Sequence, residues 1–214
     1  QFGKSISEFG LVKQKLAEMA VRCFVSEAMV YRTLGDIDRA LEAVDERDAV
    51  TVLKTVETFA IECSINKVAT SEALAYAVDE AVQVFGGNGY SREFPVERAY
   101  RDARITRIYE GTNEINRLII ATRLLKQADA LLADQIDVST TGSALQAECD
   151  SLAHAKRLAR AALASAGRTF GSAIRDEQEI LAHVADMMIE CYAIESAVGR
   201  AERMVARSRE RASI

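Results

Sequence analysis

Apolar side chains recur at steps of three and four residues along most of this chain, and this spacing constrains the fold more than any other feature. Apolar residues spaced in this way line one face of an α-helix, which must then pack against a second element. The chain contains a single proline, Pro95, and it is rich in the helix-favouring residues Ala, Leu, Arg, Glu and Lys. We therefore expect an all-α protein.

The amphipathic stretches predict six helices, which are expected over residues 6–33, 49–85, 95–104, 113–132, 144–166 and 176–208. Gly35 and Asp36 are expected to end the first helix, and residues 167–175 to form the turn between the last two. Long helices with short connections are typical of an antiparallel four-helix bundle, here with an appended helical hairpin. The expected units are a bundle over 1–133, a polar linker over 134–143 and a helical extension over 144–214.

Charge and composition exclude several classes of function. The 27 basic and 32 acidic residues give a net charge of −5, so we expect no nucleic-acid partner, which would require a basic face. No apolar run reaches the length of a transmembrane helix. The four cysteines, Cys23, Cys63, Cys149 and Cys191, form no Cys-x-x-Cys pair and are predicted to be reduced, buried thiols. With only two isolated histidines, we expect no metal site.

A glycine-rich block follows the second expected helix, in the run from Gln83 to Tyr90. Gly86, Gly87 and Gly89 could serve only to stop the helix, because glycine adopts the left-handed geometry of helix ends. Three glycines in four residues could equally let the backbone approach a phosphate or a cofactor edge. A helix and not a strand precedes them, so a Rossmann fingerprint is not indicated.

A second unusual segment carries Glu110 between Tyr109 and Gly111, just before the helix that Thr112 or Asn113 can cap. A carboxylate among apolar neighbours can be partly desolvated, which raises its pKa and makes it a better base near neutral pH. The alternative is an acidic residue that only complements the dipole at a helix N-terminus.

Taken together, the two segments are more informative than either alone. The run 83–118 strongly resembles the C-terminal signature of the acyl-CoA dehydrogenase family, and residues 2–6, 9–11 and 61–67 extend the similarity. The resemblance covers residues 1 to about 125 and is to the third, C-terminal helical domain of that family. The Phe9-Gly10-Leu11 variant and the extra helices after residue 143 are most similar to the very-long-chain branch.

The resemblance implies an FAD-dependent oxidoreductase of fatty-acid β-oxidation that converts a fatty acyl-CoA into a trans-2-enoyl-CoA. Glu110 matches the base that removes the α-proton, and Tyr109 and Gly111 are expected beside the substrate. The backbone N–H of Glu110 is expected to bind the acyl carbonyl. The expected flavin contacts are Phe2, Gln83, Gly86, Gly87, Thr112, Asn113 and Glu114.

The same resemblance implies partners and a setting. The glycine block is expected to reach the flavin of a neighbouring subunit, so a homodimer or homotetramer is implied, with an electron-transfer flavoprotein as electron acceptor. The location is expected to be the cytoplasm of a bacterium or the mitochondrial matrix of a eukaryote. Residues 1–214 match only the C-terminal part of such an enzyme, so this chain is expected to be inactive by itself.

Two alternatives remain open at this point. The chain could be a non-catalytic helical module for oligomerisation or docking that keeps the same fold. The amphipathic pair over 144–208 could associate with a membrane surface, although packing on the bundle or on a second copy is the favoured interpretation.

Overall fold

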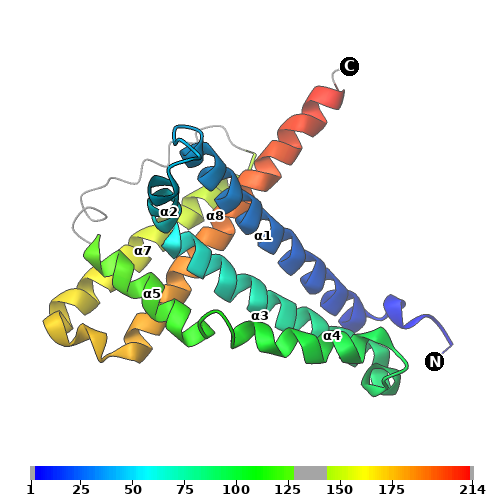
Figure 1. Cartoon of the computed structure of the whole chain (residues 1–214). Helices are drawn as coiled ribbons and strands as arrows, with labels where there is room; N and C mark the ends of the chain where they lie inside the picture. The colour runs from blue at the N-terminus through cyan, green and yellow to red at the C-terminus, as the bar shows by residue number, and fades with distance from the viewer. Residues whose placement is uncertain (1–2, 128–143, 213–214) are drawn as a thin grey trace.

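The computed structural model describes residues 3–127 and 144–212, and the side chains up to residue 208 (Figure 1). Within these ranges the chain is helical and contains no strand, which confirms the predicted all-α class. Phe2 and the expected linker over 134–143 lie outside the described residues. The main helices are α1 (Gly10–Leu41), α2 (Ala49–Glu57), α3 (Ala60–Phe85), α4 (Pro95–Ala103), α5 (Asn113–Lys126), α7 (Gln146–Phe170) and α8 (Gln178–Ala212).

Four helices form the bundle. Helices α1, α3, α5 and α8 pack in a ring, each against the next, and α8 closes the ring against α1 (Figure 1). Helices α1 and α3 run in opposite directions, as the ion pair between Lys15 and Glu80 and the hydrogen bond between Thr33 and Asn66 require. The contacts of α1 with Glu195 and Arg200 show the same for α1 and α8. Helix α7 packs along α8 and completes the hairpin. The predicted antiparallel bundle is confirmed, and α8 of the extension provides one of its four sides.

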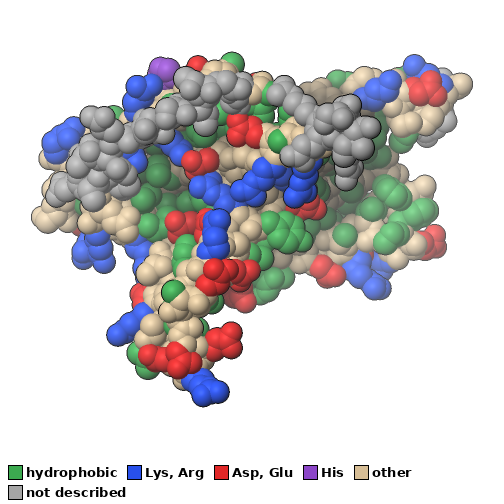
Figure 2. Space-filling model, turned by 90° about the horizontal axis from the view of Figure 1, so that it is seen from above, with side chains coloured by type: hydrophobic (Ala, Val, Ile, Leu, Met, Phe, Trp, Pro, Cys, Tyr) green, Lys and Arg blue, Asp and Glu red, His purple; other side chains and the backbone are tan. Residues whose placement is uncertain are grey.

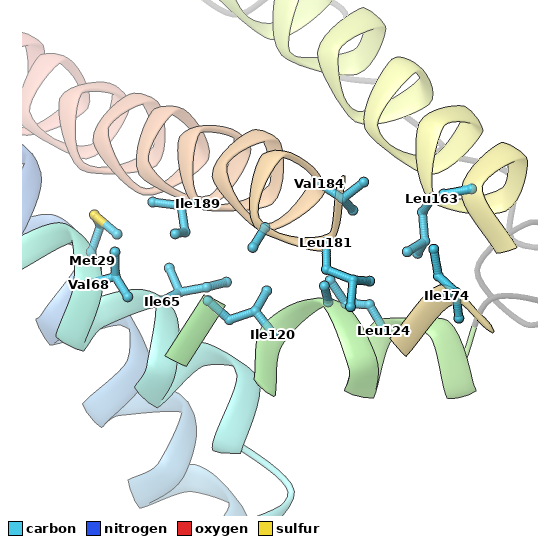
Figure 3. Packing of buried hydrophobic residues seen from close by; sticks show 13 residues of the cluster. Met29, Ile65, Val68, Ile120, Leu124, Leu163, Ile174, Leu181, Val184 and Ile189 are labelled. Carbon is cyan, nitrogen blue, oxygen red and sulfur yellow. The ribbon is translucent and has the colours of Figure 1, made fainter. Parts of the chain in front are cut away.

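One hydrophobic core joins the two predicted units. Figure 3 shows Ile65 of α3, Ile120 of α5 and Leu181 of α8 pointing toward one another. Burial of such side chains contributes about 1.5–3 kcal/mol each, so this cluster ties the extension firmly to the bundle. Its buried members are Met29, Ile65, Val68, Ile120, Ala121, Leu124, Leu163, Ala166, Ile174, Leu181, Val184, Ala185 and Ile189.

The first helix is longer than expected. Helix α1 continues through Gly35 and Asp36 to Leu41, so the predicted end at these residues is wrong. A glycine inside a helix costs about 1 kcal/mol relative to alanine. Asp36 forms ion pairs with Arg32 and Arg39 on the same helix, and these favourable contacts offset that cost.

The second expected helix is interrupted. Thr58 and Phe59 form a turn between α2 and α3, and Phe59 has a φ of −93° and a ψ of 15°, outside the helical range. The hydroxyl of Thr58 donates to the carbonyl of Thr55 at 2.6 Å, a local bond that competes with the helical pattern.

Two further expectations need correction. Helix α7 passes through Gly167, which was expected in a turn, and packs there against Leu125 of α5. Cys149 and Cys191 are buried free thiols as predicted, but Cys23 and Cys63 lie exposed on the outer sides of α1 and α3. Helix α5 ends at Lys126, and the rest of the span expected to reach 132 lies outside the described residues.

The surface is mixed in character. Acidic, basic and apolar side chains are interspersed over the face that Figure 2 shows. In the described part of the chain, no helix is long and apolar enough to cross a membrane. Within the same residues, no group of three or more His, Cys, Asp or Glu side chains has the arrangement of a metal site.

Candidate active site

Glu110 occupies a strained turn directly before α5. Its φ is 54°, and it is the only residue other than glycine with a positive φ among residues 3–127 and 144–212. Gly111 follows with a φ of 80°. The left-handed region costs an L-amino acid with a side chain roughly 1–2 kcal/mol, so the turn places a glutamate where a glycine would be more stable.

Two polar side chains of α5 hold this turn. Thr112 is the N-cap residue, and its hydroxyl accepts a hydrogen bond from the Ile115 N–H at 3.3 Å, which decides between the two predicted caps. Asn116 is buried, and its amide donates to the carbonyls of Gly111 at 2.9 Å and Thr112 at 3.1 Å. The carbonyls of Gly111 and Thr112, the two residues after Glu110, are therefore both fixed by the buried Asn116 side chain.

The Glu110 side chain is exposed in this chain. Its apolar neighbours Ile108 and Tyr109 are themselves 47% and 49% exposed, so they do not cover the carboxylate. The partial desolvation expected from the sequence is therefore not supplied by this chain alone. No described residue accepts a hydrogen bond from the Glu110 backbone N–H, which leaves this donor available beside the carboxylate.

Asn113 faces the inside of the bundle. It is 3% exposed, and its amide oxygen accepts from Lys67 Nζ at 2.7 Å. Its amide nitrogen donates to Ser71 Oγ at 3.0 Å and to Glu72 Oε1 at 3.1 Å. The Asn113 side chain, expected to contact flavin, is thus engaged with three residues of α3, and its evident role is to fix the start of α5.

Glu114 and Lys67 are charged groups close to the turn. Hydrogen bonds from its own backbone N–H and from the Thr112 hydroxyl lower the pKa of Glu114, and the charges of Arg117 and Lys67 add to this effect. Burial lowers the pKa of Lys67, while the carboxylates of Glu114, Glu110 and Glu72 act in the opposite direction. Lys67 therefore lies within electrostatic reach of Glu110.

The glycine block forms a short 3₁₀ helix, Gly86–Tyr90, that ends α3. Gly86 has a φ of 62°, and a Cβ on Gly89 would lie 2.5 Å from the Val82 carbonyl oxygen. The local fold of this chain therefore accounts for a glycine at both positions. Gly87 has neither a positive φ nor any atom within 4 Å of an added Cβ. Gln83, Gly86 and Gly87 are all exposed, so this end of α3 presents an open backbone surface.

The structure groups the expected residues into two places. Tyr109, Glu110, Gly111, Thr112 and Glu114 lie together at the start of α5, beside Lys67 of α3. Gln83 lies sixteen residues beyond Lys67 on α3, or about 24 Å at 1.5 Å per residue. The glycine block and the Glu110 turn are thus separate parts of the surface.

Sequence reasoning missed the residues under the turn. Asn116 lies four residues before the buried Ile120, so it occupies the apolar face of α5. A polar residue on an apolar face indicates a buried hydrogen bond, and this signal could have identified Asn116. The contacts of Lys67 and Glu72 with Asn113 cross from α3 to α5, and no local pattern contains them.

Comparison with known proteins places this geometry in context. Two family models, both described as acyl-CoA dehydrogenase, C-terminal domain, match residues 1–125 and 154–214. A probable acyl-CoA dehydrogenase of Bacillus subtilis is 42% identical over 96% of this chain and 38% of its own length. The human very long-chain specific acyl-CoA dehydrogenase, mitochondrial, is 41% identical over 56% of this chain and 16% of its own length.

A solved structure agrees with these matches. The crystal structure of an acyl-CoA dehydrogenase complexed with FAD from Bacillus anthracis superimposes with a TM-score of 0.88 at 39% identity, over 96% of this chain and 36% of that chain. The fold and both matched segments define a C-terminal helical domain of the acyl-CoA dehydrogenase type. The chain belongs to the acyl-CoA dehydrogenase family. It spans well under half the length of these relatives.

Proposed function

We propose that this chain supplies the α-proton base and part of the flavin surface of an FAD-dependent acyl-CoA dehydrogenase. The substrate is a fatty acyl-CoA and the product its trans-2-enoyl-CoA. Glu110 takes the α-proton, the β-hydrogen leaves with its electron pair, and a double bond forms between the α- and β-carbons. FAD, when bound, accepts that hydrogen and the electron pair.

The observation that carries this proposal is the backbone of Glu110. A glutamate in the left-handed region, next to a glycine in the same region, is a local cost without a folding benefit. Residues in such conformations cluster at functional sites, where the surrounding structure holds them in place. Thr112 and Asn116 provide that support here, which favours a chemical role for the carboxylate over a role as a helix-initiating acid.

The backbone N–H of Glu110 supports the carboxylate in this role. A donor that has no partner among the described residues can bind the acyl carbonyl oxygen as negative charge develops on it. Stabilising that charge acidifies the α-carbon, so the same residue offers both the hydrogen-bond donor and the base. Tyr109 and Gly111, on either side, are the expected substrate contacts.

The residues that would hold flavin are Gln83, Gly86, Gly87, Thr112 and Glu114. The backbone at Gly87 is exposed, and no described residue lies within 4 Å of an added Cβ, which fits the close approach of a flavin. Because Gln83 lies about 24 Å along α3 from the Glu110 side of the bundle, the glycine block suits the flavin of a second subunit. A homodimer or homotetramer follows, with an electron-transfer flavoprotein as the expected electron acceptor.

The similarity to the human enzyme supports placement in the very-long-chain branch, which activity against a series of acyl-CoA chain lengths would test. Residues 1–214 alone are expected to be inactive, because catalysis requires base, α-carbon and flavin in contact. The relatives support a cytoplasmic location in a bacterium or the mitochondrial matrix in a eukaryote.

The competing function is a non-catalytic oligomerisation module of the same fold. The absorbance spectrum of the full-length protein that carries these residues separates the two. The proposal predicts visible flavin bands that bleach when a saturated fatty acyl-CoA is added without oxygen. A colourless protein, or flavin bands that acyl-CoA leaves unchanged, would support the module instead.

A further inference from the structure

Arg117 is a largely buried charge that joins three helices. It belongs to α5, its side chain is 17% exposed, and its partners come from α3 and α8. Its Nε donates to Oδ1 of Asp186 on α8 at 2.7 Å. Its two terminal nitrogens donate to the two carboxylate oxygens of Glu72 on α3, at 2.8 and 3.1 Å. One guanidinium is therefore held from both sides.

The two carboxylates depend on each other through this guanidinium. Burial lowers the pKa of Arg117, but hydrogen bonds and charges from Glu72 and Asp186 outweigh burial and raise it, so the group stays charged. A planar guanidinium with three donors engaged has one orientation. Without Asp186, the Nε–H loses its partner and the guanidinium is held from the α3 side alone, by its two bonds to Glu72.

Glu72 connects Arg117 to the start of α5, next to the Glu110 turn. Its Oε1 atom accepts from both Arg117 and the amide of Asn113. Asn113 is the first residue of α5 and follows Glu110 by three positions. Asn116, the residue before Arg117, holds the carbonyl of Gly111. The orientation of Arg117 is thus linked, through these hydrogen bonds and the backbone of α5, to the residues on the C-terminal side of Glu110.

We propose that Asp186 is a positioning residue for the dehydrogenation: through Arg117 and Glu72 it fixes the first turn of α5 and the direction of the Glu110 carboxylate. This inference rests on the proposed function, because it assumes that Glu110 is the base. It gives α8, and with it the extension over residues 144–212, a role in the reaction in addition to its role in the core.

The expected effect follows from geometry. A displacement of about 1 Å between reacting groups can cost about 10²-fold in rate. The Asp186–Arg117 contact reaches the turn only indirectly, through Glu72 and Asn113, so we expect its loss to cost less, about 10-fold. Asp186 is 46% exposed on its side chain, so the pair itself adds little to stability. The loss should therefore appear in the rate and not in the melting temperature.

The test compares Asp186→Ala, which removes the acceptor of the Arg117 Nε–H, with the wild-type full-length holoenzyme. We expect kcat to fall about 10-fold with flavin content and melting temperature unchanged. With a substrate deuterated at the α-carbon, the isotope effect on kcat/KM should rise, because proton removal becomes slower. Asp186→Glu, which restores the charge, should recover most of the rate.

Glu27→Ala is the matched control. Glu27 of α1 pairs with Arg200 of α8 at 2.8 Å and is similarly exposed, but it has no link to α5. If Asp186→Ala behaves like this control while Glu110→Gln is inactive, the positioning inference is wrong and the proposed function stands. If Glu110→Gln keeps near-normal turnover, the proposed function fails. A slow Asp186→Ala enzyme with an unchanged isotope effect would also overturn the inference.

Discussion

Replacing Leu181 of α8 by alanine should destabilise the whole bundle and not only the extension. Leu181 is 1% exposed and belongs to the cluster that includes Ile120 and Leu124 of α5 (Figure 3). A fully buried Leu→Ala change costs about 2–5 kcal/mol, as lost transfer free energy plus a cavity term. Since the site has neighbours from α3, α5 and α8, it can collapse only partly, and we expect about 3 kcal/mol.

Urea unfolding of this chain, followed by far-ultraviolet circular dichroism, measures that loss. Hydrogen exchange on peptides from α3, α5 and α8 then shows where it falls. Leu158→Ala on α7 is the control, because Leu158 is 65% exposed and its truncation should cost no more than about 0.5 kcal/mol. The shared-core account fails if Leu181→Ala weakens protection in α8 and leaves α3 and α5 unchanged.

Three further predictions concern the turn, the glycine block and acid stability. Glu110→Gly should raise the free energy of unfolding by about 0.5–1 kcal/mol, because glycine relieves the positive φ at some cost in chain entropy; an equal or lower value in urea unfolding would contradict the strain. Gly87→Val should reduce flavin retention in the full-length protein while changing the stability of this chain by no more than about 0.5 kcal/mol; unchanged flavin affinity would make Gly87 part of a helix stop only. Burial opposes ionisation of Glu195, but its hydrogen bond with Lys156 and the charge of Arg32 lower its pKa below the usual 4.5, so its contribution to stability is present above pH 4.5 and is lost as the pH falls further. Glu195→Gln should therefore lose less stability than wild type between about pH 6 and pH 3, as denaturant titrations at each pH would show.

The sequence predicts the helices well where local signals act alone. Pro95 begins α4 and Thr112 caps α5, since a fixed φ and a side-chain acceptor act within one turn. The prediction fails where contacts between different helices determine the structure. Helix α7 continues through Gly167, which lies against Leu125 of α5, and no pattern within α7 contains that contact.

The candidate site divides in the same way. The glycine block and the Glu110 segment are each a short continuous stretch of sequence, so each motif can be recognised directly. The supporting hydrogen bonds of Asn113, Asn116 and Arg117 join residues on different helices, or lie on a face that periodicity assigns to the core. The exposure of Glu110 also escapes the sequence, because apolar neighbours in a turn need not cover the residue between them.

The central claim is that Glu110 removes the α-proton. It is tested most directly by mixing the flavin-replete full-length protein with a saturated fatty acyl-CoA without oxygen and recording the rate at which flavin absorbance bleaches. Glu110→Gln keeps the shape of the side chain and removes the base, and Glu27→Gln is the control. The account predicts bleaching about 10³-fold slower in Glu110→Gln, at unchanged flavin content, and a normal rate in the control. Bleaching of Glu110→Gln within about 10-fold of wild type, which is less than general-base catalysis commonly contributes, would contradict it.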